Sequence, residues 1–304
     1  MNKQKVIGVD VGGTKILAGI FDAGGNVLER VQIASPTDSA EELLAGVEQV
    51  VEKLLGPEIG AIGFGIPANI DQRSGIVLGS ANLPLRGVYF DRRMRQRFEL
   101  PVRVDNDANL AAIAEWKAGV GRGTSDLVML TLGTGVGGGL ILGGKPYRGS
   151  VGGGAELGHM VILHDGPRCQ GNCSGYGHLE VLTSGRAAAL AAREELGLDI
   201  DARELVALAD AGDEPARALL RKMGERLGSA LGSIVNIFNP ELIIIGGGFA
   251  AAGELILAPA RERMARESLP GMAELTRVVL AELGPDAGMI GASFVAFEAL
   301  EQMG

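Results

Sequence analysis

A strand–glycine turn–strand pattern occurs twice in this chain of 304 residues and constrains its fold more than any other feature. The first copy is KVIGVDVGGTKILAGIFD, residues 5–22, and the second is DLVMLTLGTGVGGGLILGG, residues 126–144. Each copy is an apolar strand, a Gly/Thr turn and a second apolar strand. Glycines allow backbone N–H groups to approach a bound anion closely. Two such turns predict two walls of a cleft that hold one polyphosphate.

Two other interpretations of these turns are open. The second turn contains Gly133-x-Gly135-x-x-Gly138, the dinucleotide-binding fingerprint. That fingerprint needs a helix directly after its glycines, whereas residues 140–142 read as a strand, so a dinucleotide site is disfavoured. The other alternative is a glycine-rich hairpin without a ligand. Polar side chains beside the glycines of both turns favour phosphate binding: Asp10, Thr14 and Lys15 in the first, Thr131 and Thr134 in the second.

Composition limits the class of protein. A hydrophobic content of 46% and a charged content of 21% are typical of a soluble globular protein, and 304 residues are enough for two lobes with separate cores. The net charge of −9 argues against a general nucleic-acid binder. No apolar run reaches the length of a membrane span, and Asp10 and Gly12 interrupt any signal-peptide core. We expect a cytoplasmic protein.

Apolar periodicity predicts alternating strands and helices in two α/β lobes. The first lobe has expected strands at 6–9, 16–21, 27–33, 62–66 and 102–104 and helices at 39–55, 91–98 and 108–118. The second has strands at 127–132 and 242–245 and helices at 186–196, 202–210 and 215–238. In the last helix Gly224, Gly228 and Gly232 recur every four residues and predict a close helix-packing face. A C-terminal helix at 290–300 is expected to return to the first lobe.

Three strand ends carry candidate binding groups. Asp10 ends an apolar strand, where a carboxylate is costly without a partner. A magnesium ion on nucleotide phosphates would supply that partner, directly or through water. Asp105, Asn106 and Asp107 lie between a strand and a helix; one of them suffices as a helix cap, so a carboxylate there could accept a proton from an attacking hydroxyl. Gly246 to Gly248 could accept the flat face of a base or ribose.

The only two cysteines lie in one short loop with two histidines nearby. His159, Cys169, Cys173 and His178 are four soft or borderline ligands within twenty residues. Thiolates and imidazoles suit tetrahedral zinc. The alternative interpretation is a pair of free thiols with unrelated histidines.

Several of these motifs occur together in one order: DVGGTK, NDAN, LGTGVGGG, and AELGH with its cysteine loop. In this order they resemble the ROK family (repressor, open reading frame, kinase) over nearly the whole chain. The resemblance implies an α/β, two-lobed, actin-like ATPase (ribonuclease H-like) fold, with sugar and nucleotide in the interlobe cleft. We expect a small lobe of residues 1–107 plus about 290–304 and a large lobe of residues 108–289 that carries the zinc loop.

The resemblance also implies an activity. ROK kinases phosphorylate hexoses with ATP and Mg²⁺, and the spacing of CQGNC and HLE is similar to that of the glucokinase branch, which feeds glycolysis. N-acetylmannosamine, N-acetylglucosamine, fructose or another hexose as substrate, and polyphosphate as donor, stay open. A sugar-responsive transcription regulator is a further alternative, but the first strand begins at about Val6 and leaves no room for a helix-turn-helix domain. Family proteins are usually homodimers or homotetramers, so we expect a homo-oligomer without nucleic-acid or membrane partners.

The resemblance assigns roles position by position. Asp107 matches the catalytic base. The matched sugar ligands are Asn82, Asn106, Asp107, Glu156, His159 and Glu180. The matched nucleotide-binding residues are Asp10, Gly12, Gly13, Thr14, Lys15, Thr131, Gly133, Thr134, Gly135, Gly246, Gly247 and Gly248. The family binds structural zinc with one histidine and three cysteines; here a histidine replaces one cysteine, so the implied zinc ligands are His159, Cys169, Cys173 and His178.

Overall fold

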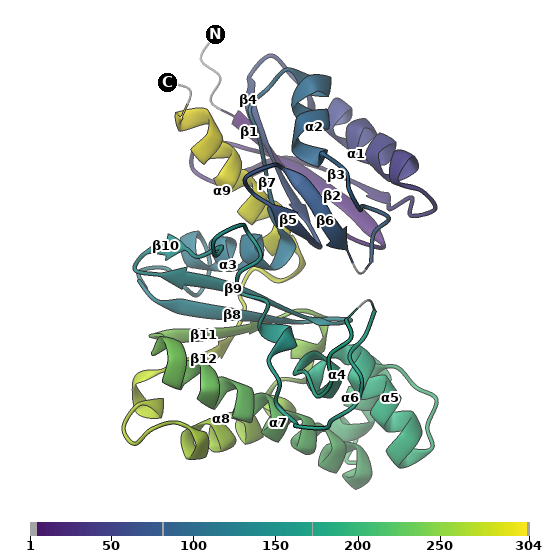
Figure 1. Cartoon of the computed structure of the whole chain (residues 1–304), viewed down its shortest axis with the longest axis vertical. Helices are drawn as coiled ribbons and strands as arrows, with labels where there is room; N and C mark the ends of the chain where they lie inside the picture. The colour runs from purple at the N-terminus through teal and green to yellow at the C-terminus, as the bar shows by residue number, and fades with distance from the viewer. Residues whose placement is uncertain (1–4, 81, 172, 303–304) are drawn as a thin grey trace. The chain divides into compact units, whose positions relative to one another are not determined.

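The computed structural model describes residues 5–80, 82–171 and 173–302, and its helices and strands are drawn in Figure 1. The chain divides into two compact units. The first contains Met1–Arg122, Pro146–Gly154 and Pro285–Gly304, and the second contains Gly123–Lys145 and Ala155–Gly284. Residues 108–122, 146–154 and 285–289 therefore lie in the first unit, although the sequence assigned them to the large lobe. Residues 1–4 and 303–304, at the ends of the expected small lobe, are outside the described residues.

The first unit contains a five-stranded sheet in the order β3-β2-β1-β4-β7. Its central strand β1 is antiparallel to β2 and parallel to β4, and β4 is parallel to β7. The strands are β1 (Lys5–Val11), β2 (Lys15–Phe21), β3 (Val27–Ala34), β4 (Ile59–Ile66) and β7 (Val102–Asn106). A separate hairpin is formed by β5 (Ala68–Asp71) and β6 (Ile76–Ser80).

Different helices cover the two faces of this sheet (Figure 1), because successive residues of a strand point to opposite sides. Ile7 and Val9 of β1 share a core with α1 (Ala40–Leu54) and α2 (Phe90–Phe98). Val6 shares a second core with α9 (Ala287–Glu301). Helix α3 (Asp107–Lys117) packs on α9 so closely that a Cβ added at Gly291 would overlap the Leu110 backbone. This packing explains why α3 belongs to the first unit.

The second unit repeats the topology of the first. Its sheet order is β10-β9-β8-β11-β12, with the central strand β8 antiparallel to β9 and parallel to β11. The strands are β8 (Leu127–Leu132), β9 (Val136–Leu142), β10 (Lys145–Pro146), β11 (Leu242–Gly246) and β12 (Arg277–Leu280). A strand, β9, therefore follows the second glycine turn, which confirms that the turn is not a dinucleotide-binding fingerprint.

The helices of the second unit pack on its sheet in one core. They are α4 (Glu180–Thr183), α5 (Gly185–Leu196), α6 (Ala202–Asp210), α7 (Glu214–Phe238) and α8 (Glu254–Glu267). The short 3-10 helices of this unit are η1 (Leu157–His159), η2 (Gly248–Ala252) and η3 (Ala273–Leu275), and η4 (Gly284–Asp286) begins at the last residue of this unit and continues into the first. Six strands and α-helices were not predicted from the sequence: β5, β6, β10, α4, α8 and β12. All except α8 are short, and α8 contains an internal proline, Pro259, which lowers helix propensity. Within the described residues, no helix has the length and apolarity needed to cross a membrane.

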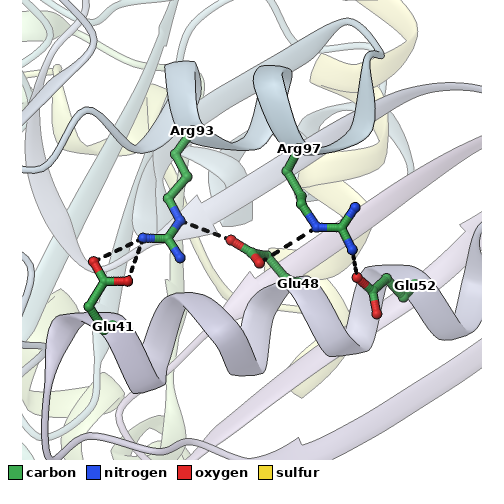
Figure 2. A network of polar contacts seen from close by, with 5 residues as sticks. All are labelled: Glu41, Glu48, Glu52, Arg93 and Arg97. Atoms are coloured by element: carbon green, nitrogen blue, oxygen red, sulfur yellow. Dashed lines mark hydrogen bonds and ion pairs between the residues drawn. The ribbon is translucent and has the colours of Figure 1, made fainter.

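A network of ion pairs joins α1 and α2 on the surface of the first unit (Figure 2). Arg93 Nε lies 2.9 Å from Glu48 Oε1, and Arg93 Nη1 lies 2.7 Å from Glu41 Oε2. Arg97 pairs with the other Glu48 oxygen at 3.7 Å and also with Glu52. Single exposed pairs contribute little to stability, but shared partners in a network contribute more. Glu48 is the residue shared by both arginines and fixes α2 against α1.

The glycine ladder in α7 forms the predicted close helix-packing face, which the structure confirms. Gly224, Gly228 and Gly232 face α8, and a Cβ added at any of them would crowd the backbone or side-chain base of that helix. The nearest α8 residues are Ile256, Ala260 and Glu267. The absence of side chains at these positions lets the two helix backbones approach closely.

We expect the substitution Gly228→Ala to lower the free energy of unfolding. The added Cβ would overlap the Ala260 carbonyl oxygen and lie 2.6 Å from the Arg263 Cβ, so α8 must shift. Overpacking costs about 1–3 kcal/mol, against a gain in helix propensity of about 1 kcal/mol for Ala over Gly. Urea denaturation followed by circular dichroism measures the difference. Ser233→Ala, on the exposed side of α7, is the control and should stay within about 0.5 kcal/mol of wild type; an equally stable Gly228→Ala protein would contradict the close packing.

Candidate functional site

The first glycine turn joins β1 to β2 in the first unit. Gly12 N donates to Lys15 O at 2.9 Å and closes the hairpin. Ser35 Oγ donates to Gly12 O at 2.5 Å and fixes the turn from β3's end, a role that the sequence pattern does not predict. Asn82 lies beside the turn, since a Cβ added at Gly13 would be 3.6 Å from Asn82 O. The structure therefore brings the predicted sugar ligand Asn82 to the predicted phosphate turn.

Asp10 lies near the end of β1 as a half-buried carboxylate. It packs against the first turn of α9, where a Cβ added at Gly288 would be 2.7 Å from the Asp10 Cγ. Burial and the nearby charge of Asp107 raise the pKa of Asp10 to about 7, although Lys15 acts in the opposite direction. Two neighbouring carboxylates in a partly desolvated place are unfavourable unless a proton or a cation accompanies them. Their chemistry fits Mg²⁺, which prefers carboxylate oxygens and phosphates as ligands.

The three polar residues at the junction of β7 and α3, Asp105, Asn106 and Asp107, make different contacts. Asn106 is the helix N-cap, and its Oδ1 accepts from Ala108 N at 2.9 Å and from Asn109 N at 3.3 Å. Asp107 is the first residue of α3, half-buried, and its Oδ1 accepts from Ala108 N at 2.9 Å. Burial raises the pKa of Asp107. Because Asn106 caps the helix, the Asp107 carboxylate can serve another purpose.

Asp105, the third residue of this junction, is buried and structural. Its Oδ2 accepts from Arg148 Nε at 2.6 Å, and its Oδ1 accepts from Asn109 Nδ2 at 3.1 Å. The Asp105 side chain is 4% exposed, so the ion pair is largely desolvated. Arg148 is 43 residues away in the chain, and no local pattern in the sequence indicates it. The pair attaches the segment Pro146–Gly154 to the strand end that precedes Asp107.

The second and third glycine turns line one cavity of the second unit. Thr131 of β8 and Gly246 of β11 are register neighbours in parallel strands, so the turns that follow them lie at the same sheet edge. The cavity has a volume of about 720 Å³. Its lining residues are Gly133, Thr134, Gly185, Arg186, Ala189, Asp201, Ala202, Arg203, Val206, Ala207, Asp210, Gly248, Phe249 and Ala251.

Gly247 allows the third turn to reach this cavity. Its φ is +86°, and a Cβ there would lie 2.6 Å from the Leu132 carbonyl carbon. No heavy atom lies within 4 Å of the position that a Cβ would take at Gly248, which lines the cavity. A side chain at Gly247 would push the turn away from β8, because the backbones are already in contact.

The cavity wall combines polar and apolar groups that the sequence analysis did not identify. Arg186 and Arg203 supply positive charge, and the wall includes the start of α5, where Gly185 N donates to Gly133 O at 2.8 Å. Val206 and Phe249 supply apolar surface. A cavity with both kinds of group suits a ligand with a flat base and phosphates. Only packing brings α5, α6 and η2 together, so no motif could identify these residues.

The predicted zinc ligands converge in the second unit. Nitrogen or sulfur atoms of His159, Cys169, Cys173 and His178 all lie within 4.8 Å of one another. His159 Nδ1 lies 3.2 Å from His178 Nδ1, Cys169 Sγ lies 3.6 Å from His159 Nδ1, and Cys173 Sγ lies 3.7 Å from His178 Nδ1. We call these four residues the Cys/His cluster.

These distances fit a tetrahedral metal. Bonds of about 2.0 Å to nitrogen and about 2.3 Å to sulfur would separate two nitrogens by roughly 3.3 Å and a nitrogen from a sulfur by roughly 3.5 Å. Burial raises the pKa of the Cys169 thiol to about 11, with a further contribution from Cys173. A bound cation reverses this preference, because it favours the thiolate. The residues therefore suit zinc.

The remaining predicted sugar ligands lie around the cluster. Glu156 precedes η1, which ends at the cluster residue His159. Ala155, directly before Glu156, has a φ of +66°, a costly conformation for a residue with a side chain and one that is frequent at binding sites. Glu180 begins α4, and its Oε2 accepts from Val136 N at 2.9 Å, next to the second glycine turn. Glu156 and His159 are thus positioned by the η1 segment, and Glu180 is positioned by α4.

The substitution Asp10→Asn should stabilise the protein in a pH-dependent manner. With a folded pKa of about 7 and an unfolded value of 3.8, the folded state retains a proton between these values that the unfolded chain has lost. The contribution of Asp10 to the free energy of unfolding is therefore fully present below about pH 4 and is lost as the pH rises through about 7. The gain for Asp10→Asn should be on the order of 2–4 kcal/mol at pH 8 and vanish near pH 4, since one pKa unit corresponds to about 1.4 kcal/mol. Urea denaturation at pH 4, 6 and 8 without ligands measures it.

Asp71→Asn is the control with the opposite sign. Hydrogen bonds from Ser74 Oγ and Arg73 N lower the pKa of Asp71. Its contribution is present above its unfolded pKa, so the asparagine variant should lose stability at neutral pH. An Asp10→Asn protein whose stability difference from wild type is constant between pH 4 and 8 would contradict the raised pKa.

Comparison with known proteins gives one family and relatives of similar length. The model of the ROK family matches residues 6–299. A glucokinase of Thermotoga maritima is 35% identical over 315 residues, which cover 98% of this chain and 99% of that protein. An N-acetyl-D-glucosamine kinase of Escherichia coli is 36% identical over 302 residues, 95% of this chain and 98% of that protein. A solved structure of a ROK family glucokinase from Streptomyces griseus, in complex with glucose and AMPPNP, has a TM-score of 0.84 and 35% identity over 97% of this chain and 99% of that chain.

These likenesses extend over both units of the chain. The two sheets with their helices agree with the two-lobed α/β fold of ROK kinases, so the expected actin-like ATPase fold is confirmed. From its match over residues 6–299 and its full-length relatives, we conclude that this protein belongs to the ROK family.

Proposed function

We propose that this protein is an ATP-dependent hexose kinase and that glucose is its preferred substrate. The products would be glucose 6-phosphate and ADP. The observation that carries the proposal is the β7–α3 junction, where Asn106 caps the helix and leaves the half-buried Asp107 carboxylate for chemistry. The glucokinase relative and the glucose complex of a family member support the choice of glucose. The N-acetylglucosamine kinase relative keeps that sugar as the alternative substrate.

Phosphoryl transfer requires a base, phosphate binding and positioning. Asp107 would accept the proton of the sugar hydroxyl while its oxygen attacks the γ-phosphorus in line. The new O–P bond forms as the bond to the bridging oxygen of ADP breaks, and ADP leaves with that oxygen. Burial, which raises the pKa of Asp107, makes this carboxylate a stronger base than an exposed one. A bound Mg²⁺ would neutralise phosphate charge, and Asp10 would hold it directly or through water.

Each unit carries residues that we assign to the sugar and the nucleotide. We assign the sugar hydroxyls to Asn82 and Asn106 in the first unit and to Glu156, His159 and Glu180 in the second. His159 has Nδ1 in the Cys/His cluster, so its Nε2 would serve the sugar. The base and ribose would occupy the 720 Å³ cavity at Gly246 to Gly248, and the phosphates would bind the two glycine turns, Gly12 to Lys15 and Gly133 to Gly135. ATP, rather than polyphosphate, suits a cavity with an apolar wall.

The resemblance to the ROK family also suggests an assembly and a location. We propose a homodimer or homotetramer that works in the cytoplasm. Ile237, Leu269 and Leu275 of the second unit are between 64% and 67% exposed and are candidates for a subunit contact. Sedimentation of wild type beside an Ile237→Asp variant would test that assignment.

An assay of ATP-dependent phosphorylation tests the function directly. Wild type should phosphorylate glucose faster than mannose, fructose, N-acetylglucosamine or N-acetylmannosamine. Asp107→Asn should lower kcat by about 10²–10⁴-fold because the general base is lost, while AMPPNP affinity stays within about threefold. Coupled spectrophotometry gives the rates and calorimetry the affinity.

The matched control for this assay is Asp213→Asn. Asp213 is the N-cap of α7, where asparagine caps equally well, so its kcat should equal that of wild type. Preference for an N-acetyl sugar would change the substrate but keep the mechanism. An Asp107→Asn enzyme with wild-type kcat would exclude Asp107 as the base.

Zinc should bind the Cys/His cluster at one ion per chain. Substitution Cys173→Ser, or removal of the metal with a chelator, should lower the melting temperature by several degrees and weaken glucose binding, because the loop that carries His159 and Glu180 loses its anchor. Mass spectrometry of the metal content, thermal unfolding and calorimetry measure the three quantities. His164→Ala, at an exposed histidine outside the cluster, should change none of them. Unchanged glucose affinity in verified metal-free protein would refute the anchoring role.

A further inference from the structure

Glu180 contacts the second glycine turn from outside it. Its Oε2 accepts a hydrogen bond from Val136 N at 2.9 Å. Gly135 makes this contact possible, because a Cβ at that position would overlap the same oxygen. Five residues further along the chain, Gly185 N donates to Gly133 O at 2.8 Å. Helix α4 and the start of α5 therefore hold the turn at both of its ends.

The two histidines of the Cys/His cluster lie on segments that contact this turn. His178 precedes Glu180 by two residues, in a segment that is buried from 177 to 179. His159 is the last residue of η1, and Gly158 beside it packs so closely on β9 that a Cβ would overlap the Val136 carbonyl oxygen. Both histidine segments thus contact Val136. The segment of His178 contacts the Val136 N–H through Glu180, and the segment of His159 contacts the Val136 carbonyl group through Gly158.

We propose that Glu180 is a positioning residue for the Gly133–Val136 turn, and that metal binding at the Cys/His cluster acts on this turn through Glu180. The inference rests on the proposed kinase function and deepens it, because it gives a residue that we assign to the sugar a second role toward the nucleotide. A carboxylate that accepts from a backbone N–H makes a charge-assisted hydrogen bond, which is stronger than a neutral one. In metal sites, hydrogen bonds between the ligands and the residues around them fix the orientation of both. A metal at the Cys/His cluster would therefore help to fix the position of Glu180, two residues after His178.

The two simplest substitutions of Glu180 separate the two roles. Glu180→Ala removes the acceptor of Val136 N, so AMPPNP affinity without sugar should fall about tenfold, the effect of one lost hydrogen bond to a partly buried amide. Glu180→Gln keeps an oxygen that can accept from Val136 N, so AMPPNP affinity should stay within about threefold of wild type while glucose affinity changes. A residue that only binds sugar would affect AMPPNP affinity in neither variant.

The experiment is calorimetric titration of AMPPNP without sugar, in wild type and variants with verified metal content. Gly135→Ala is the second variant: its Cβ displaces the Glu180 carboxylate while Glu180 remains, and it should show the same loss. Glu214→Ala is the matched control, because Glu214 is the exposed first residue of α7. Metal removal should weaken AMPPNP binding severalfold in wild type and add little in Glu180→Ala, since coupled groups are not additive.

Two results would overturn the inference. One is equal AMPPNP affinity in wild type, Glu180→Ala and Gly135→Ala, all shown to be folded by circular dichroism. The other is an equal effect of metal removal in wild type and Glu180→Ala, which would show that the cluster acts independently of Glu180. A folded, metal-loaded wild type that binds no AMPPNP would instead refute the kinase proposal, and this inference with it.

Discussion

Both units depend on a central strand that is antiparallel to its hairpin partner and parallel to its other neighbour. β1 with β4, and β8 with β11, run in the same direction, so their carboxyl ends meet at one edge of each sheet. The tight glycine hairpins return the chain without covering that edge. Residues that are distant in sequence therefore lie close together at this edge. In the second unit Thr131 and Gly246 are neighbours in register, and in the first unit the charges of Asp10 and Asp107 interact.

The two units carry complementary chemistry on the same topology. The first unit collects half-buried carboxylates with raised pKa values, which suit a proton acceptor and a divalent cation. The second collects backbone donors of a glycine turn, the start of α5 and two arginines around an apolar cavity, which suit phosphates and a base. The Cys/His cluster lies close to the second glycine turn. The segments that carry its two histidines both contact Val136, through Glu180 on the Val136 N–H and through Gly158 on the Val136 carbonyl oxygen.

Local patterns in the sequence predict local structure well. The strand at 127–132 and the helix at 202–210 have the predicted bounds, and the α7 glycine ladder packs as expected. Helix α8 was not predicted because Pro259 interrupts its pattern and its place is set by contact with α7. Likewise, the membership of α3 in the first unit depends on α9, which begins 170 residues after α3 ends.

The sequence by itself determined the repeated glycine turns, the polar junction at residues 105–107 and the four residues of the Cys/His cluster, because each arises from residues close together in the chain. Only the tertiary structure decided which contacts the junction residues make: Asn106 caps α3 and Asp105 pairs with Arg148, whereas Asp107 does neither. It also decided which residues surround the cavity of the second unit and that Glu180 accepts from Val136 N. The physical reason is that the partner of a buried polar group is set by packing between distant segments, and no local pattern records it.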